Sequence, residues 1–210
     1  MKAVFVNYCF TPDWIRDYDF DYVIYDRSDD GKDWLKDFPS ERIIKTANIG
    51  QVDYDKLNYL INNYDNLPEM FLWSKSNLFK FITPEEYEKV ANNKVFTPLL
   101  TKNHKIYSDQ NGVVCYYQGE WYKERNDNWF FNQFPSKYVN SFNEWAEMFQ
   151  LPTLDYIPFS PGGSYILTRE KVHKYSRDYY QRMAGMLPYA REPVEAQCAE
   201  RSYGLMWGDI

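Results

Sequence analysis

The sequence predicts an α/β protein with a central mixed, mostly parallel sheet flanked by helices. Apolar runs typical of strands alternate with helical patterns over residues 1–100, the order expected when parallel strands are joined by helices. The chain has 210 residues, enough to bury a substantial core. No internal repeat and no Gly-, Pro- or Ser-rich linker divides it. We therefore expect a single domain with two halves, residues 1–100 and 101–210.

Strands in the first half are indicated by short runs of β-branched and aromatic residues that end at turn residues. The predicted strands are residues 2–10, 22–25, 42–46 and 69–73. A helix is predicted from Gln51, because apolar side chains recur at helical spacing. These side chains are Leu57, Leu60, Ile61 and Tyr64. A second helix is predicted after Thr83, a capping residue that is followed by Pro84 and two glutamates.

The second half begins with an aperiodic segment rich in aromatic and amide side chains, residues 101–150. It predicts a hairpin from residues 113–117 and 121–122, and a helix over residues 142–149. Flat rings with polar groups are suited to stacking on a sugar, although the segment equally serves as padding for the sheet. The aromatic residues concerned are Tyr116, Tyr117, Trp121, Tyr122, Trp129, Phe130 and Phe131.

The last sixty residues regain a regular pattern. A strand is predicted after the Gly162-Gly163 pair, and Thr168 is predicted to cap one helix that includes Val172 and Met183. A final short helix is predicted from residue 192 to residue 207.

Composition excludes several functional classes. The 24 Lys and Arg against 30 Asp and Glu give a net charge of −6, so no basic field attracts nucleic acid or an anionic membrane. No apolar run approaches the ~20 residues of a membrane span or the ~7–15 of a secretory segment, which predicts a soluble, cytoplasmic protein. Three cysteines and two histidines do not make a zinc site, and no glycine-rich phosphate loop occurs.

Polar residues follow the predicted strands. Ligands of open α/β sheets bind at the carboxyl ends of the strands, so these residues are expected to converge on one crevice. Polar residues also end strands that bind nothing, and this simpler explanation stays open. The candidates are Asn7, Tyr8, Asp26, Arg27, Asn48, Gly50, Ser74, Lys75, Ser76 and Asn77.

Two further groups of candidates lie in the second half. Gly162 and Gly163 permit close approach of a ligand to the backbone, or alternatively form only a tight turn. Glu195 and Glu200 are about 140° apart around the predicted last helix, so both cannot face one pocket. At most one of them is a catalytic base.

Four segments resemble motifs of GT-A-type glycosyltransferases. They are NIG (48–50), YLINNYDNLP with the following FL (59–68 and 71–72), FSPGGSYILTRE (159–170) and ERSYGLMWG (200–208). The resemblance extends over most of the chain from about residue 45 and is closest to amino-terminal glycosyltransferase domains of chlorovirus multidomain proteins that build capsid glycans. It implies that the chain is one domain of a longer viral protein acting in the host cytoplasm.

The resemblance also implies a reaction and a set of roles. The protein is expected to move a sugar from a UDP-sugar to a glycan or glycoprotein acceptor, with Mn²⁺ (or Mg²⁺) on the diphosphate. Nucleotide binding is assigned to Asn7, Tyr8, Asp26, Arg27, Asn48, Gly50 and Lys75; the donor sugar to Gly162 and Gly163; the metal to Ser74, Ser76 and Asn77. Glu195, and second Glu200, is the candidate base of an inverting enzyme. A retaining enzyme needs none, and the sequence does not distinguish the two.

One departure from the family pattern raises an alternative. GT-A enzymes usually carry a DxD motif after the fourth strand, where this chain has Ser74-Lys75-Ser76-Asn77. Divalent metals prefer charged oxygen ligands, and these positions offer none. The second hypothesis is a non-catalytic domain on the same scaffold that binds a nucleotide sugar or a carbohydrate.

Overall fold

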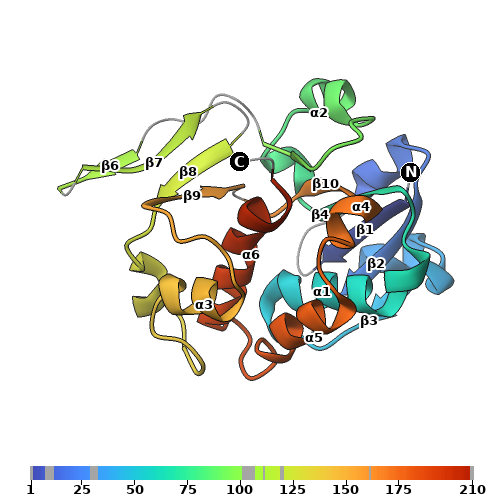
Figure 1. Ribbon diagram of the computed structural model, residues 1–210. Helices are drawn as coiled ribbons and strands as arrows, with labels where there is room; N and C mark the ends of the chain where they lie inside the picture. The colour runs from blue at the N-terminus through green and yellow to red at the C-terminus, as the bar shows by residue number, and fades with distance from the viewer. Residues whose placement is uncertain are drawn as a thin grey trace.

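A computed structural model describes residues 2–7, 12–28, 33–100, 107–110, 112–118, 121–160 and 162–208 (Figure 1). Within these residues the fold is α/β, with a six-stranded sheet and a separate four-stranded sheet. Six short 3-10 helices complete the described elements. They are η1 (Asp13–Asp17), η2 (Asp33–Asp37), η3 (Ser40–Arg42), η4 (Tyr64–Asn66), η5 (Leu78–Lys80) and η6 (Trp129–Asn132).

The large sheet has the order β3-β2-β1-β4-β10-β5. Its strands are β1 (Lys2–Asn7), β2 (Asp21–Asp26), β3 (Ile43–Lys45), β4 (Met70–Lys75), β5 (Thr97–Pro98) and β10 (Tyr165–Thr168). Strands β1 to β4 are mutually parallel, and β10 is antiparallel to both β4 and β5, so the predicted mostly parallel sheet is confirmed. Strand β10 belongs to the second half of the chain but lies between two strands of the first, so both halves build one sheet.

Alternate residues of the strands point to opposite faces of this sheet, and each face has its own core. On one face Val4, Trp73 and Leu167 pack against α1 (Gln51–Asn63), α5 (Arg177–Gly185) and α6 (Val194–Trp207). On the other, Phe5, Leu72 and Ile166 pack against the 3-10 helices and α2 (Pro84–Val90). Because both faces of the sheet are buried, these strands are apolar at successive positions and do not alternate between apolar and polar residues.

The aperiodic segment contributes most of the small antiparallel sheet, of order β6-β7-β8-β9. Its strands are β6 (Tyr107–Asp109), β7 (Gly112–Gln118), β8 (Trp121–Arg125) and β9 (Tyr156–Phe159). The pairing of β7 with β8 confirms the predicted hairpin, and α3 (Phe142–Met148) confirms the predicted helix. This sheet lies to the left of α6 in Figure 1, while the large sheet lies to its right.

One helix prediction is wrong. The pattern from Val172 to Met183 predicts a single helix, but the chain forms α4 (Arg169–Val172) and then α5. Thr168 does cap α4, accepting from the amide of Lys171 at 3.3 Å. The hydroxyl of Ser176 then accepts from the amide of Tyr179 at 3.2 Å and begins a new helix. A capping hydrogen bond competes with continuation of the helix, and here it prevails.

Helix α6 is buried along nearly all its length, because it lies between the two sheets. Gly204 faces β9: a Cβ on it would lie 2.3 Å from the carbonyl oxygen of Pro158. None of the helices in the described ranges is both long and apolar enough to cross a membrane.

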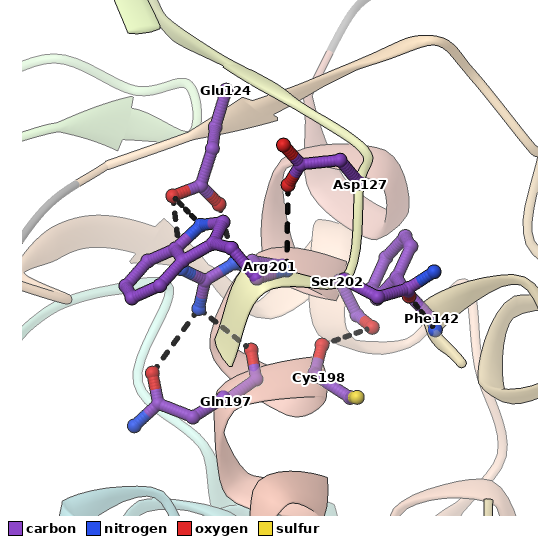
Figure 2. Close-up of polar contacts among 9 residues, drawn as sticks. Glu124, Asp127, Phe142, Gln197, Cys198, Arg201 and Ser202 are labelled. Carbon is purple, nitrogen blue, oxygen red and sulfur yellow. Dashed lines mark hydrogen bonds and ion pairs between the residues drawn. The ribbon is translucent and has the colours of Figure 1, made fainter. Parts of the chain in front are cut away.

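A buried ion pair joins α6 to the small sheet (Figure 2). Arg201 and Glu124 are 2% and 4% exposed, and Arg201 uses both Nε and Nη2 to hold the carboxylate, the second at 3.0 Å. The Glu124 carboxylate also accepts from the indole N–H of Trp129 at 3.1 Å. The guanidinium lies over the ring of Phe130, 4.2 Å from its centroid. These contacts fix the orientation of α6.

Candidate functional site

A hollow of about 230 Å³ lies at the carboxyl edge of the parallel strands. The ends of β1, β2 and β4 form one wall, and the first turn of α1 and the residues just before α6 form the other. Its lining residues are Val6, Arg27, Asn48, Gln51, Val52, Lys75, Ser76, Asn77, Arg191 and Glu192. Five of the predicted site residues are therefore brought together. Arg27, Asn48 and Lys75 are assigned to the nucleotide, and Ser76 and Asn77 to the metal on its diphosphate.

The start of α1 is placed at the hollow by its backbone. Gly50 has φ +66°, and a Cβ there would lie 2.8 Å from the Cβ of Tyr54. The amides of Gly50 and Gln51 donate to the carbonyl oxygens of Ala190 and Arg191 at 2.8 and 3.0 Å. Gly50 does not line the hollow, so its contribution is to bring residues 190 and 191 against the helix. Gln51 adopts φ +50°, a strained conformation that such contacts sustain.

Two arginines contribute positive charge to the walls. Arg27 is 2% exposed; its Nε lies 3.1 Å from Oδ2 of Asp55, and its Nη2 donates to the carbonyl oxygen of Ile49. Burial lowers the pKa of Arg27 and raises that of Asp55 to about 6, and the opposite charge of each group offsets part of this effect on the other. The Asn48 amide lies against Arg191, and with its oxygen toward the guanidinium it accepts from Nε and Nη2 at 3.1 and 3.2 Å.

The four residues in place of a DxD motif have different environments. The Ser74 hydroxyl is buried and bonded to the carbonyl oxygen of Lys75 at 2.8 Å and to the Ser164 hydroxyl at 3.0 Å, so it does not face the hollow. β4 extends two residues beyond its predicted end, which places Ser74 inside the strand. Lys75 is 28% exposed, and its Nζ lies 3.4 Å from Oε1 of Glu200. Ser76 and Asn77 follow the strand and line the hollow.

The other predicted nucleotide ligands lie apart from the hollow or cannot be placed. The buried carboxylate of Asp26 accepts from the amide and hydroxyl of Ser28 at 3.0 and 2.7 Å and from Lys45 at 2.8 Å. Burial opposes ionisation, but these hydrogen bonds outweigh it and lower the pKa of Asp26. Asp26 thus shapes the turn that carries Arg27. Asn7 is the last residue of β1, but the structure does not describe its side chain, and Tyr8 lies outside the described residues.

The two predicted donor-sugar glycines adopt left-handed conformations, with φ +90° at Gly162 and +59° at Gly163. A Cβ on Gly162 would lie 2.7 Å from the ring of Phe81, and one on Gly163 would lie 2.7 Å from Oε1 of Glu200. The amide of Gly163 donates to the carbonyl oxygen of Ser160 at 3.0 Å, which closes a tight turn. Glycine is required here because the backbone lies directly against the Glu200 carboxylate.

Beneath this turn lies a buried charged group that the sequence patterns did not single out. Lys56 is fully buried; its Nζ donates to the carbonyl oxygen of Gly163 and lies 5.2 Å from the ring centroid of Trp73. Asp53, three residues earlier, accepts from the Tyr203 hydroxyl at 3.0 Å, and its other oxygen is buried without a hydrogen bond from any of the described residues. Burial raises the pKa of Asp53 to about 6 and lowers that of Lys56 to about 8.

A sequence signal for this group does exist. Asp53 and Lys56 lie one turn before Leu57 and Leu60 on the predicted helix, so two charges occupy its apolar face. Buried charges are expensive unless they are paired, and such placement is more frequent near functional sites. Arg191 and Glu192, in contrast, lie at the hollow because their segment packs against the start of α1. No pattern in the neighbouring sequence predicts that contact.

The structure separates the two candidate bases, as their 140° spacing predicts. Oε1 of Glu195 accepts from the amides of Lys137 and Tyr138 at 3.0 and 2.7 Å, and its other oxygen accepts from the Tyr189 hydroxyl. Glu195 is fully buried, so it anchors a loop. Glu200 lies beside Lys75 and Gly163, next to the hollow. These contacts favour Glu200, the second choice from sequence, over Glu195.

Several aromatic residues expected to stack on a sugar have structural partners. Trp121 stacks on Phe96 with centroids 5.5 Å apart, and Phe130 is 2% exposed beneath Arg201. Trp129 is 38% exposed, so it alone among these three presents a broad open surface. Tyr122 and Phe131 are half-buried. The side chains of Tyr116 and Tyr117 lie outside the description.

The side chains at the hollow do not fit a divalent metal. Among the described residues, no three His, Cys, Asp or Glu side chains gather as a metal-binding group. Of the predicted ligands, Ser74 is engaged in the core, and Ser76 and Asn77 offer only neutral oxygens. Glu192 is the single carboxylate among the lining residues, against three cations. Mg²⁺ and Mn²⁺ prefer several negatively charged oxygen ligands, whereas the charged side chains that line this hollow are mostly cationic.

The fold and the hollow define a class: an α/β protein with a polar, cation-lined hollow at the carboxyl edge of a mostly parallel sheet. A scan of the chain against models of known protein families finds no match, and a search of curated proteins also finds none.

Proposed function

We propose that this protein is a GT-A-type glycosyltransferase that transfers a sugar from a UDP-sugar to a glycan or glycoprotein acceptor. One observation carries the proposal most strongly. Five residues assigned to the donor site from strand ends and family-like motifs, between Arg27 and Asn77, line a single hollow. That hollow lies at the carboxyl edge of the parallel strands, the usual ligand site of open α/β sheets.

The site offers groups suited to each part of such a donor. The hollow is flanked by the cations Arg27, Lys75 and Arg191, which suit a diphosphate. Glu200 is not itself a lining residue, but its carboxylate lies 3.4 Å from the Nζ of Lys75, which lines the hollow. We assign Glu200 as the base that accepts the proton of the acceptor hydroxyl, whose oxygen bonds to the anomeric carbon while the bond from that carbon to the diphosphate breaks. Lys75 then stabilises the charge that develops on the leaving diphosphate.

The donor assignment predicts selective stabilisation by uridine nucleotides. UDP at 100 times its Kd is expected to stabilise the fold by about 2.7 kcal/mol, which raises the Tm by roughly 5–10 °C. The measurement is a thermal shift with UDP, GDP and CMP, each with Mn²⁺ and with EDTA. A smaller shift with GDP and CMP is expected. No shift with any nucleotide under either condition would contradict the donor assignment.

The assignment of Glu200 predicts a large kinetic effect. Glu200→Gln is expected to slow UDP-sugar hydrolysis, with water as acceptor, by about 100-fold or more, because the amide cannot accept the proton. Glu195→Gln is the matched control: we expect a lower Tm and an unchanged rate per folded molecule, because Glu195 holds a loop. The assay measures UDP released from UDP-glucose, UDP-galactose and UDP-N-acetylglucosamine. Equal rates for Glu200→Gln and the wild type would mean that Glu200 is not the base.

The second candidate is a non-catalytic domain that binds a nucleotide sugar or a carbohydrate. Among the described residues no cluster of metal-ligating carboxylates lies around the hollow, which favours this candidate. It predicts that UDP-sugars bind and stabilise the fold but are neither hydrolysed nor transferred. The hydrolysis assay above therefore separates the two functions.

The biological setting that we propose follows the resemblance of the motifs. The chain would act as one domain of a longer viral protein in the cytoplasm of the host, where it would extend a capsid glycan. A complex with an intact UDP-sugar would identify the carboxylate that faces the anomeric carbon.

A further inference from the structure

We infer that the donor diphosphate is held by cations of the chain, chiefly Lys75 with Arg191, and that donor binding needs no divalent metal. The inference rests on the proposed function, because it concerns how that site holds its ligand. It differs from the metal dependence that the resemblance implies. Three observations carry it: the position of Lys75, the charges of the walls and the engagement of the nearby carboxylates.

Lys75 is the last residue of β4, the central strand whose carboxyl end borders the hollow. Its side chain is 28% exposed and reaches into the site from the same segment that carries metal ligands in the DxD pattern. A lysine ammonium on a flexible four-carbon stem can follow a phosphate group. The segment therefore presents a positive charge where a metal-binding carboxylate is usually found.

The walls of the hollow carry three cations, Arg27, Lys75 and Arg191, and one carboxylate, Glu192. Asp55 offsets Arg27 from behind, at 3.1 Å from its Nε, and Glu200 approaches Lys75 at 3.4 Å. A diphosphate entering this site meets opposite charges directly. A divalent cation would instead meet like charges at close range, which disfavours its binding.

The carboxylates nearest to the strand ends are already engaged within the fold. Asp26 is bonded to Ser28 and Lys45, and Asp55 is paired with Arg27. Asp53 is fully buried under the Gly162–Gly163 turn, beside Lys56. Recruiting Asp55 or Asp53 to a metal would take a charge partner away from a buried cation, Arg27 or Lys56, which is strongly destabilising; recruiting Asp26 would break the hydrogen bonds of its turn. Neutral oxygens of Ser76 and Asn77 do not replace them.

The test is the affinity for UDP, measured by isothermal titration calorimetry in EDTA and in Mn²⁺. For the wild type we expect Kd values that agree within about twofold in the two conditions. Lys75→Met is expected to weaken binding at least tenfold, and Lys75→Arg to stay within a few-fold of the wild type. Lys174→Met is the matched control: it removes an exposed lysine between α4 and α5 that does not line the hollow.

Each outcome decides the question. Binding that appears only with Mn²⁺ overturns the inference and leaves the proposed function in place. Binding in EDTA that Lys75→Met does not weaken also overturns it, because Lys75 would then contribute nothing. No binding of UDP to the wild type in either condition overturns the proposed function itself. Circular dichroism of each variant verifies folding, and Lys75→Gln replaces Lys75→Met if the latter does not fold.

Discussion

Gly204→Ala is expected to destabilise the fold by about 3 kcal/mol, which lowers the Tm by roughly 6–12 °C. The added Cβ would lie 2.3 Å from the carbonyl oxygen of Pro158 and 3.1 Å from the ring of Trp121. The nearest atom belongs to the backbone of β9, so it cannot move aside as a flexible side chain would. Helix α6 must shift away from the small sheet, and thermal or urea unfolding measures the loss.

Gly185→Ala is the control for this prediction. Gly185 is the last residue of α5, and apart from its chain neighbours and the backbone of its own helix no heavy atom of the described residues lies within 4 Å of the position that its Cβ would take. Alanine has a higher helix propensity than glycine, so we expect a change of at most about 1 kcal/mol, toward greater stability. If both variants unfold alike, the close contact between α6 and β9 is not part of the native packing.

Arg201→Met is expected to destabilise the fold by about 3–5 kcal/mol, because it leaves Glu124 buried and charged without its partner. Figure 2 shows the two groups facing each other, with Gln197 supplying further acceptors to Arg201. Glu124→Gln is expected to cost a similar amount, since it leaves the guanidinium unpaired. Urea unfolding of each variant measures the effect.

The double variant Arg201→Met/Glu124→Gln tests the explanation. It leaves no charge unpaired, so much of the loss from the single variants should be recovered, and the double-mutant cycle should give a large coupling. The exposed pair Lys36–Asp33 is the comparison: its side chains are 79% and 94% exposed, and Lys36→Met should produce no measurable change. Additive losses at Arg201 and Glu124 would contradict a buried, coupled pair.

The strands and helices of the large sheet could be predicted because each is decided by local residues. The four predicted strands of the first half match β1 to β4, and the helix from Gln51 matches α1. Thr83 caps α2, as predicted, because its hydroxyl accepts from the amide of Glu86; the Glu86 carboxylate in turn accepts from the amide of Thr83. The sequence pattern does not predict the break between α4 and α5, because Ser176 lies within a continuous run of apolar residues at helical spacing. A single side-chain hydrogen bond outweighs periodicity there.

The candidate site could be predicted in part for the same reason. Arg27, Asn48, Lys75, Ser76 and Asn77 follow strands whose carboxyl ends must share one edge of a parallel sheet. The same reasoning fails for Asp26 and Ser74. Both adjoin the site in sequence, but their side chains form hydrogen bonds within the fold, with Ser28 and Ser164, and do not face the hollow. A residue's position after a strand does not determine the direction of its side chain.

The sequence by itself determined the fold class, the strand-end segments that meet at the hollow, and the separation of Glu195 from Glu200 around one helix. Those features follow from periodicity and backbone geometry, which act over a few residues. Only the tertiary structure decided that Glu200 lies beside Lys75, that Glu195 holds a loop, and that Arg191 reaches the site. These three placements depend on how α6 and the segment before it pack between the two sheets. Such packing brings together residues that are far apart in the sequence, so no pattern within a few residues predicts it.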